Sequence, residues 1–478
     1  MTDSIEVDYL VVGAGAMGMA FTDTILAESD ATVALVDRRG QPGGHWNDAY
    51  PFVRLHQPSS FYGVNSTPLG HDRIDELGGN AGLYELATGA EVCAYFAQVL
   101  HHRFLPSGRV HHLPLHHHDG DGEVVSLATG RRTTITAGKV VDATYQNVTV
   151  PAMRPPAFAV APDIRCEPVN ALARLEAPPD GYTVVGGGKT AMDAVLWLLV
   201  NDVDPDRITW IRPRESWLLD RANIQPGEQF AARAIGQVVA QMEAAAAAES
   251  FEDLFDRLET AGALLRLDRS IRPTMYRCAT VTRSEVAALQ RVERVIRLGR
   301  VERIDDDRIV LQEGSVPTGP GVLHIDCTAD GLQRRPPQPV FDGDRVCLQP
   351  VRTCQQVFSA AFIAHVELAR PDDEARNALC GVVPHPDTDI DWARTFLATT
   401  INGAVWNGEP DIRRWLREAR LDGFSRARSG AGADPELRAM LRRVIEIGPA
   451  ALTRVQELLA SYDSPSTDRQ REHEQGTR

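Results

Sequence analysis

The sequence lacks the features that mark membrane proteins and nucleic-acid-binding proteins. No apolar run approaches the length of a membrane span. The formal net charge of −15 would repel nucleic acid and anionic lipid alike. Residues 1–8 carry acids and no basic start of the kind that opens a secretion signal. We therefore expect a cytoplasmic protein with no nucleic-acid or membrane partner, and the sequence indicates no oligomeric state.

Closely spaced cysteine pairs are also absent. The seven cysteines show no CxxC or CxxxxC spacing, and an odd, scattered set is typical of reduced and packed thiols. They are Cys93, Cys166, Cys278, Cys327, Cys347, Cys354 and Cys380. We therefore expect no dithiol relay of the glutathione-reductase kind.

The sequence does contain a glycine-rich turn near its start. Tyr9–Val12 predicts a buried parallel strand, and Met19–Glu28 predicts a helix. Between them, Gly13-Ala14-Gly15-Ala16-Met17-Gly18 has the GxGxxG spacing: the first glycine permits the turn, the second lets a pyrophosphate approach the backbone, and the third lets helix and strand pack closely. We expect Gly13, Gly15, Ala16, Met17 and Gly18 to bind a dinucleotide at the helix N-terminus.

The charge after the next strand indicates which dinucleotide binds. The strand Thr32–Val36 ends in Asp37, whose carboxylate can accept both hydroxyls of an unphosphorylated ribose, as in FAD or NAD. Pro42 and the two glycines after it predict a loop that lies flat against a large ring system. Its candidate contacts are Arg38, Gly44, His45 and Trp46. Trp46 either covers that ring or is a packed aromatic residue.

Two further segments carry many polar side chains. Residues 54–66 have no regular period, so they form either an active-site wall or a surface loop. Short alternating runs from Arg109 to Val141 predict a small antiparallel sheet. It contains His111, His112, His116, His117 and His118. Alternation places neighbouring histidines on opposite faces and no cysteine completes a ligand set, so we expect solvated histidines and no metal.

The opening pattern recurs in the middle of the chain. The strand Tyr182–Val185 leads into Gly186-Gly187-Gly188-Lys189-Thr190-Ala191 and then a helix, Met192–Val200. The next strand ends in Arg212, with Arg214 close behind, where the first unit has an acid. Arginine there pairs with a 2′-phosphate, which predicts an NADPH site; the alternative is a surface arginine pair. The candidate contacts are Gly186, Gly188, Lys189, Thr190, Arg212 and Arg214.

These patterns predict an α/β fold with two Rossmann-like dinucleotide-binding domains, the first interrupted by the second, and added C-terminal helices. Residues 226–300 look largely helical, and Val346–Val351 followed by the helix Ser359–Leu368 should return the chain to the first nucleotide. We expect the first domain at residues 1–175 and 301–385, the second with a helical insertion at 176–300, helices at 386–462 and a disordered tail at 463–478.

These residues carry a family likeness. About residues 8–368 resemble the two-dinucleotide-binding-domain flavoproteins, and within them the flavin-containing monooxygenase-like group. The likeness rests on the two glycine turns, Asp37, the GGxW segment Gly43–Trp46 and the strand end Asp326–Gly331, where it implies a cofactor contact at Asp330. The chain departs from the group's FxGxxxH fingerprint, having Val160 and Ile164 at the glycine and histidine positions after Phe158.

The resemblance implies an NADPH-dependent FAD monooxygenase acting on a small organic molecule with molecular oxygen. NADPH would reduce FAD, and the reduced flavin would capture oxygen as a C4a-hydroperoxide that oxygenates a heteroatom or an electron-rich carbon. His56, Gln57 and Ser59 are the candidate catalytic residues, because they could hydrogen-bond the flavin or its peroxide. Two alternatives stay open: an NADPH-linked flavin dehydrogenase or reductase without oxygen transfer, and a nucleotide-binding redox sensor without turnover.

Overall fold

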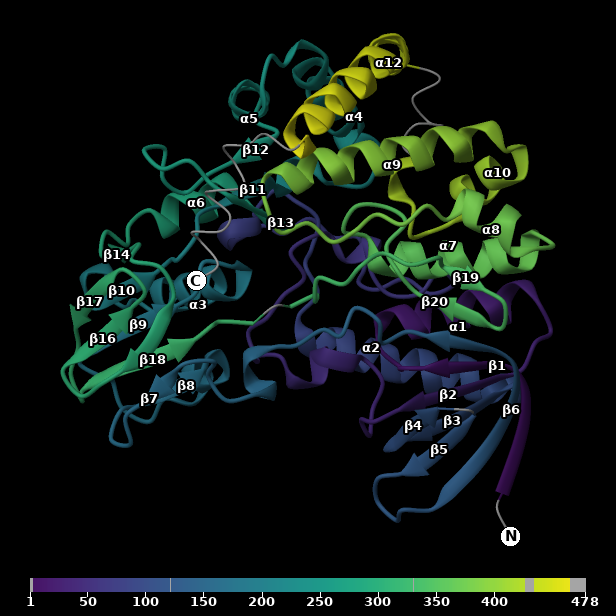
Figure 1. The fold of residues 1–478 in the computed structure, drawn as a ribbon, viewed down its shortest axis with the longest axis horizontal. Coiled ribbons are helices and arrows are strands. Elements are labelled where there is room, and N and C mark those ends of the chain that lie inside the picture. Colours follow the sequence, from purple (N-terminus) through teal and green to yellow (C-terminus); the bar gives the residue numbers. More distant parts are fainter. Residues whose placement is uncertain (1–2, 121, 330, 426–433, 465–478) are drawn as a thin grey trace.

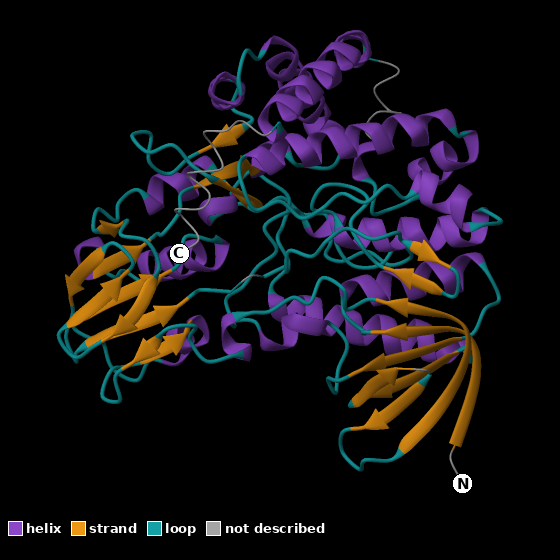
Figure 2. Ribbon diagram, in the orientation of Figure 1, coloured by secondary structure: helices purple, strands orange, loops and turns teal. Residues whose placement is uncertain are grey.

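Two parallel sheets, each flanked by helices, organise the computed structural model (Figures 1 and 2). The structure describes residues 3–120, 122–329, 331–425 and 434–464. Asp330 and nearly all of the tail predicted at 463–478 lie outside the described residues. No described helix combines the length and the apolarity that a membrane crossing needs. The predicted α/β fold with two Rossmann-like sheets is confirmed by the strand order.

The first sheet has the order β19-β20-β6-β1-β2-β3. Its strands are β1 (Asp3–Val12), β2 (Val33–Asp37), β3 (Val110–Pro114), β6 (Arg132–Asp142), β19 (Phe341–Asp342) and β20 (Arg345–Cys347). All neighbours are parallel except the pair β19–β20. Helices α1 (Ala16–Glu28) and α7 (Gln356–Ala369) pack side by side on one face, and α2 (Gly89–Val99) adds to the same core.

The segment 109–141 differs from its prediction. Only β4 (His116–Gly120), β5 (Glu123–Ser126) and the β5–β6 pair are antiparallel, whereas β3 and β6 join the large parallel sheet. Strand β3 lies at the edge of the sheet, and four of its five residues are partly or fully exposed, which resembles a half-buried antiparallel strand. The alternating pattern therefore predicted partly exposed strands correctly. It did not predict that β3 and β6 pair with their neighbours in parallel.

The second sheet has the order β14-β10-β9-β18-β8. Its strands are β8 (Cys166–Pro168), β9 (Gly181–Val185), β10 (Ile208–Ile211), β14 (Val295–Ile296) and β18 (Val322–Asp326), and α3 (Lys189–Val200) follows β9. A smaller sheet beside it joins β7 (Ala159–Val160), β15 (Val301–Ile304), β16 (Arg308–Leu311) and β17 (Gly314–Pro317). Because β18 pairs with β9, the chain returns to the first sheet only at β19, later than the boundary predicted at residue 301.

A helical layer covers the upper side of the molecule in Figure 1. The insertion contains α4 (Ala231–Ala247), α5 (Phe251–Thr260) and α6 (Arg283–Leu289), and α12 (Pro435–Asp463) packs along α4. Helices α8 (Asp373–Leu379), α9 (Ile390–Gly408) and α10 (Pro410–Glu418) lie between this layer and α7. The insertion also holds a sheet of β12 (Leu264–Leu265), β11 (Ser216–Asp220) and β13 (Met275–Val281), of which β12 and β13 fall inside the region predicted as largely helical.

Candidate functional site

We call the part built on the first sheet the first lobe, and the part built on the second sheet the second lobe. A cavity of about 1740 Å³ is lined by residues of both lobes. Ordinary small-ligand pockets measure roughly 300–1,000 Å³, so this one has room for more than one small molecule. Of the residues predicted to bind a cofactor or act in catalysis, many contribute to its wall. These are Gly13, Gly15, Ala16, Met17, Asp37, Arg38, Gly44, His45, Trp46, His56, Gln57, Lys189 and Thr190.

The first glycine turn has the geometry that a pyrophosphate requires. Gly13 sits at φ +106°, a conformation that favours glycine. A Cβ on Gly18 would overlap the carbonyl oxygen of Gly13, so the third glycine is what lets α1 pack so close to the turn. Gly15 is the N-cap of α1, and no described side chain caps that helix end. The dipole and N–H groups of α1 are therefore directed at the cavity wall formed by Gly15, Ala16 and Met17.

Asp37 is already built into this turn. One carboxylate oxygen accepts a hydrogen bond from the backbone N–H of Ala14 at 2.7 Å, and the other accepts one from the N–H of Arg39 at 2.7 Å. The side chain is buried at the end of β2 and lines the cavity. Each carboxylate oxygen still has a second acceptor position, which can serve a ribose hydroxyl.

An aromatic wall follows the acid. Trp46 lines the cavity and donates its indole N–H to the hydroxyl of Tyr62 at 2.7 Å. The ring of His45 stacks on Trp46 with centroids 5.3 Å apart. Burial and the nearby Arg39 guanidinium lower the pKa of His45 to about 4, so this ring is neutral at pH 7. Trp46 thus both packs and faces the cavity, and the two alternatives for it are compatible.

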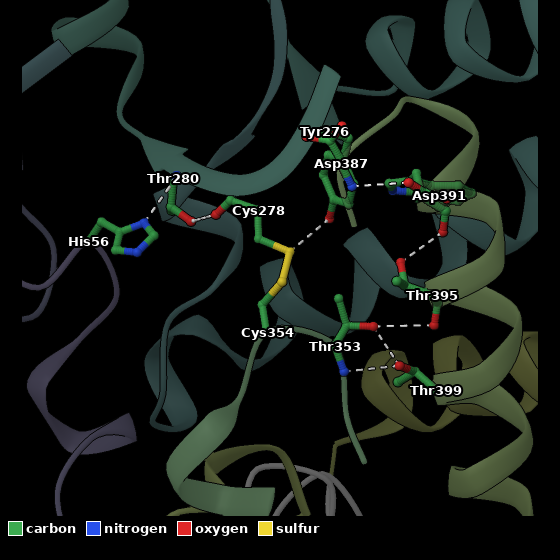
Figure 3. Close-up of a disulfide and its surroundings, with 11 residues drawn as sticks. His56, Tyr276, Cys278, Thr280, Thr353, Cys354, Asp387, Asp391, Thr395 and Thr399 are labelled. Atoms are coloured by element: carbon green, nitrogen blue, oxygen red, sulfur yellow. Dashed lines mark hydrogen bonds between the residues drawn. A yellow bond between two sulfur atoms is a disulfide. The ribbon is translucent and has the colours of Figure 1, made fainter. Parts of the chain in front are cut away.

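His56 and Gln57 of the polar loop face the cavity. The Nδ1 atom of His56 accepts a hydrogen bond from the backbone N–H of Thr280 in β13 at 3.3 Å, so the ring carries its proton on Nε2 (Figure 3). Burial and the positive charge of Lys189 lower the pKa of His56 to about 3. At neutral pH His56 is therefore a hydrogen-bond donor to the cavity and carries no charge.

Ser59 does not lie where the sequence predicted. It is buried and does not line the cavity. Its hydroxyl donates to the carbonyl of Glu85 at 3.0 Å and accepts from the N–H of Ala87 at 2.8 Å. The hydroxyl thus donates one hydrogen bond and accepts another within the loop, so Ser59 fastens the loop behind the cavity wall. A polar loop identifies a wall, but it does not show which side chains turn inward.

The second glycine turn opens toward the same cavity. Gly186 sits at φ +135°, and a Cβ on Gly188 would meet no atom within 4 Å, which leaves space over the N-terminus of α3. Among the described side chains none caps that helix end. Lys189 and Thr190, at the start of α3, line the cavity. Gly186 and Gly188 lie outside the cavity lining, so a nucleotide there would extend from the cavity along the turn.

Arg212 and Arg214 are both held by carboxylates. Arg212 is buried over the ring of Trp210 and forms an ion pair with Glu215 at 3.2 Å. Arg214 is about a third exposed and donates two hydrogen bonds to Asp387, at 3.1 and 2.9 Å. A 2′-phosphate can approach Arg214 more readily than Arg212. Binding of the phosphate by this pair stays a prediction.

The histidines predicted to be solvated are in fact divided between surface and cavity. His116, His117 and His118 of β4 line the cavity, and the Nε2 atoms of His112 and His118 are buried without a protein partner in the described part of the chain. Burial lowers the pKa of both rings. Within the described ranges, no group of three or more His, Cys, Asp or Glu side chains is arranged to hold a metal ion.

The feature that differs most from what the sequence predicted is a disulfide. Cys278 in β13 is bonded to Cys354, just before α7, with their Cα atoms 6.5 Å apart (Figure 3). Both line the cavity. The expectation of reduced thiols is wrong for this pair and holds for Cys93, Cys166, Cys327, Cys347 and Cys380, which are free. The two partners are separated by 76 residues, so no local spacing announces them.

Comparison with known proteins identifies close relatives. The uncharacterized protein Rv2000 of Mycobacterium tuberculosis (strain ATCC 25618 / H37Rv) is 54% identical over 419 residues, which cover 88% of this chain and 78% of that protein. The uncharacterized protein Mb2023 of Mycobacterium bovis matches with the same figures. The chain belongs to the family of these mycobacterial proteins. A scan against protein-family models gives no match.

Solved flavoenzymes show a more distant likeness. A flavin monooxygenase mutant from Stenotrophomonas maltophilia is 16% identical with a TM-score of 0.45, over 79% of this chain and 100% of that one. A polycyclic ketone monooxygenase from Thermothelomyces thermophila is 12% identical with a TM-score of 0.49, over 91% and 89%. Because these TM-scores lie below 0.5, the strand order and the turns of this chain carry the assignment of the fold.

Two residues at this cavity, Tyr50 and Asp193, were not predicted from the sequence. The hydroxyl of Tyr50 donates to Asp193 at 2.6 Å, and Asp193 also pairs with Lys189. This network ties the first lobe to α3 and lines the cavity. Burial and the Asp193 carboxylate raise the pKa of Tyr50 well above its ordinary value, so the phenol stays protonated. The spacing of Lys189 and Asp193, one helical turn apart, could have been noticed; Tyr50 gave no signal.

Proposed function

We propose that this protein is an NADPH-dependent FAD oxidoreductase that oxygenates a small organic molecule at a heteroatom or an electron-rich carbon. One observation carries the proposal. A single cavity is lined both by the first glycine turn with Asp37 and by Lys189 and Thr190 at the start of α3. Two dinucleotides bound on the two turns would therefore meet in one shared cavity, as an electron transfer between them requires.

FAD fits the first turn on the geometry of this chain. A pyrophosphate would fit against the turn at Gly13 and the uncapped N-terminus of α1. An unphosphorylated ribose would fit the free acceptor positions of Asp37. Trp46 and His56 border the next part of the cavity, where a ring system would lie. When bound, FAD would supply the electron-transfer and oxygen chemistry that protein side chains lack.

NADPH fits the second turn with one rearrangement. Lys189 places a positive charge at the cavity end of α3, where it can meet a phosphate. The guanidinium of Arg214 would exchange Asp387 for the 2′-phosphate, because it is the more exposed of the two arginines. The solved cyclohexanone monooxygenase from Rhodococcus sp. Phi1, 14% identical with a TM-score of 0.45 over 91% of this chain and 98% of that one, is described as bound to NADP⁺.

The residues at the wall would orient the reactants and limit water. His56 would donate an Nε2–H hydrogen bond into the cavity, and it cannot serve as an acid at pH 7 because its pKa is about 3. Gln57 offers an amide donor and acceptor beside it. Tyr50, Asp193 and Lys189 would hold the two lobes in register around the bound nucleotides.

A reductase without oxygen transfer is the second candidate. The observation that favours it concerns Ile164, which stands at the histidine position of the FxGxxxH fingerprint. Ile164 is buried in an apolar cluster with Val185 and Ile211, so the position provides no hydrogen bond to retain NADP after the flavin is reduced. The two functions differ in the fate of oxygen, which an experiment can follow directly.

The test begins with purified protein loaded with FAD. NADPH should bleach the flavin without oxygen, and faster than NADH does. With methyl phenyl sulfide and ¹⁸O₂, a monooxygenase should form sulfoxide carrying one labelled oxygen. Bleaching by NADPH with an acceptor reduced under nitrogen and no labelled product would favour the reductase. Absence of bound flavin would contradict both.

A further inference from the structure

The disulfide joins two units that are far apart in sequence. Cys278 belongs to β13 of the insertion, and Cys354 lies between β20 and α7 of the first lobe. Cys278 is buried, whereas Cys354 is only half-buried. Both sulfurs belong to side chains that line the cavity shared by the two glycine turns. The pair is therefore placed at the wall of the candidate active site, which a purely structural disulfide does not require.

The surroundings of Cys354 favour its thiolate. Cys354 directly precedes Gln355, the N-cap of α7, and no side chain in the described part of the chain caps this helix end. Helix α7 has 14 residues, and its N-terminal residue Gln356 lines the cavity. The positive end of a helix dipole lowers the pKa of a neighbouring cysteine and makes its sulfur a good leaving group.

The surroundings of Cys278 offer one hydrogen-bonding partner, and a neutral histidine lines the same cavity. The hydroxyl of Tyr276 lies 3.7 Å from the Sγ atom of Cys278 and must be the donor, since a disulfide sulfur carries no hydrogen. His385 lines the same cavity, and its Nδ1 atom is buried without a partner among the described residues. Burial and the Arg277 guanidinium lower the pKa of His385 to about 4, so the ring is neutral at pH 7.

These observations indicate that the disulfide does more than cross-link two parts of the chain. We propose that Cys278–Cys354 is a redox-active disulfide that accepts two electrons from the reduced flavin in this cavity. The S–S bond breaks, the Cys354 sulfur leaves as a thiolate at the N-terminus of α7, and the Cys278 sulfur takes one proton from solvent. Bound FAD would supply the two electrons, which come originally from NADPH, and the one proton that it would release to solvent balances the proton taken up by Cys278. The inference rests on the proposed function.

The experiment counts electrons and thiols in the FAD-loaded protein. Under nitrogen the holoprotein is photoreduced stepwise with a deazaflavin sensitiser, which does not depend on NADPH. It is then denatured, treated with N-ethylmaleimide and digested for mass spectrometry. We expect uptake of four electrons per chain, two for the flavin and two for the pair, with the label appearing on Cys278 and Cys354 only after reduction.

Two variants provide the comparison. The double variant C278S/C354S should take up two electrons, while C93S, which removes a free cysteine outside the cavity lining, should still take up four. If the double variant fails to fold, labelling of the wild-type protein decides alone. A repeat with NADPH should reduce the pair to the same extent.

The other outcomes separate this inference from the proposed function. Uptake of only two electrons with the pair unlabelled, or a pair that opens only with a phosphine, overturns the inference and leaves the function standing. Label on the pair before any reduction also overturns it. Four electrons on photoreduction with none from NADPH contradicts the NADPH assignment and supports the inference. A chain that binds no FAD overturns both.

Discussion

The two glycine turns differ in how completely each is built before a ligand arrives. At the first, Asp37 is fixed by the N–H groups of Ala14 and Arg39, and its remaining acceptor positions face the cavity. At the second turn, the two arginines after β10 already form ion pairs: Arg212 with Glu215, and Arg214 with Asp387. A preformed site costs little to occupy, whereas a ligand at the second turn must displace ion pairs.

This difference suits the two nucleotides that we propose. A resident flavin benefits from a cradle that needs no rearrangement, because binding then retains most of the interaction energy. A reductant that must enter and leave benefits from a site whose affinity is moderated by competing carboxylates. Substitutions of three kinds test this difference. In decreasing order of expected effect at neutral pH, they change the glycines of the two turns, the charge of Arg214, and the hydrogen bond of His56.

The largest effect is expected at Gly18. Gly18→Ala would drive a methyl group into the carbonyl of Gly13 and push α1 away from the turn. We expect loss of bound FAD and a fall in the free energy of unfolding of about 1–3 kcal/mol, which is typical of overpacking. Thermal unfolding and the flavin content of the purified protein measure the two effects.

The matched control is Gly188→Ala in the second turn. Its Cβ would meet no atom within 4 Å, and Gly188 has φ −89°, which any residue adopts. The fold and the flavin content should therefore be unchanged, while NADPH binds more weakly because the methyl group occupies the phosphate space. Equal destabilisation by both alanines would contradict the proposed difference between the turns.

An intermediate effect is expected from the charges at Arg214. Arg214→Gln should raise the KM for NADPH by about tenfold, the cost of one charge-assisted hydrogen bond, and leave the KM for NADH nearly unchanged. Asp387→Asn should act in the opposite direction, because it weakens the carboxylate that competes for the same guanidinium. Steady-state reduction of the flavin with each nucleotide measures both. Parallel changes for NADPH and NADH in either variant would show that Arg214 does not read the 2′-phosphate.

The sequence predicted features that depend on residues close together in the chain better than features that join residues far apart in it. The turns at Gly13 and Gly186 and the strand end at Asp37 are local patterns, and the structure has the two Rossmann-like sheets that they predicted. The pairing of β18 with β9 and the bond from Cys278 to Cys354 join residues remote in the chain, and no local spacing encodes them. Ser59 and His56 lie in one polar loop, yet only His56 faces the cavity, because side-chain direction in an irregular loop is set by packing.

The smallest effect at neutral pH concerns the hydrogen bond through His56 that joins the polar loop to β13. Its pKa of about 3 in the folded protein lies below the ordinary value of 6.5, because burial and Lys189 disfavour the charged ring. Unfolding therefore takes up a proton between about pH 6.5 and pH 3, so the stability that neutral His56 contributes is complete above pH 6.5 and falls as the pH drops. The slope is about 1.4 kcal/mol per pH unit for one such group. His56→Asn should remove one group's share of that slope while keeping a side-chain acceptor for the Thr280 N–H, so denaturant unfolding at pH 7 and pH 5 should show a smaller difference in the variant than in the wild type. An unchanged difference would mean that His56 titrates alike in the folded and the unfolded chain, and a ring that is charged at pH 5 could not accept the hydrogen bond that joins the polar loop to β13.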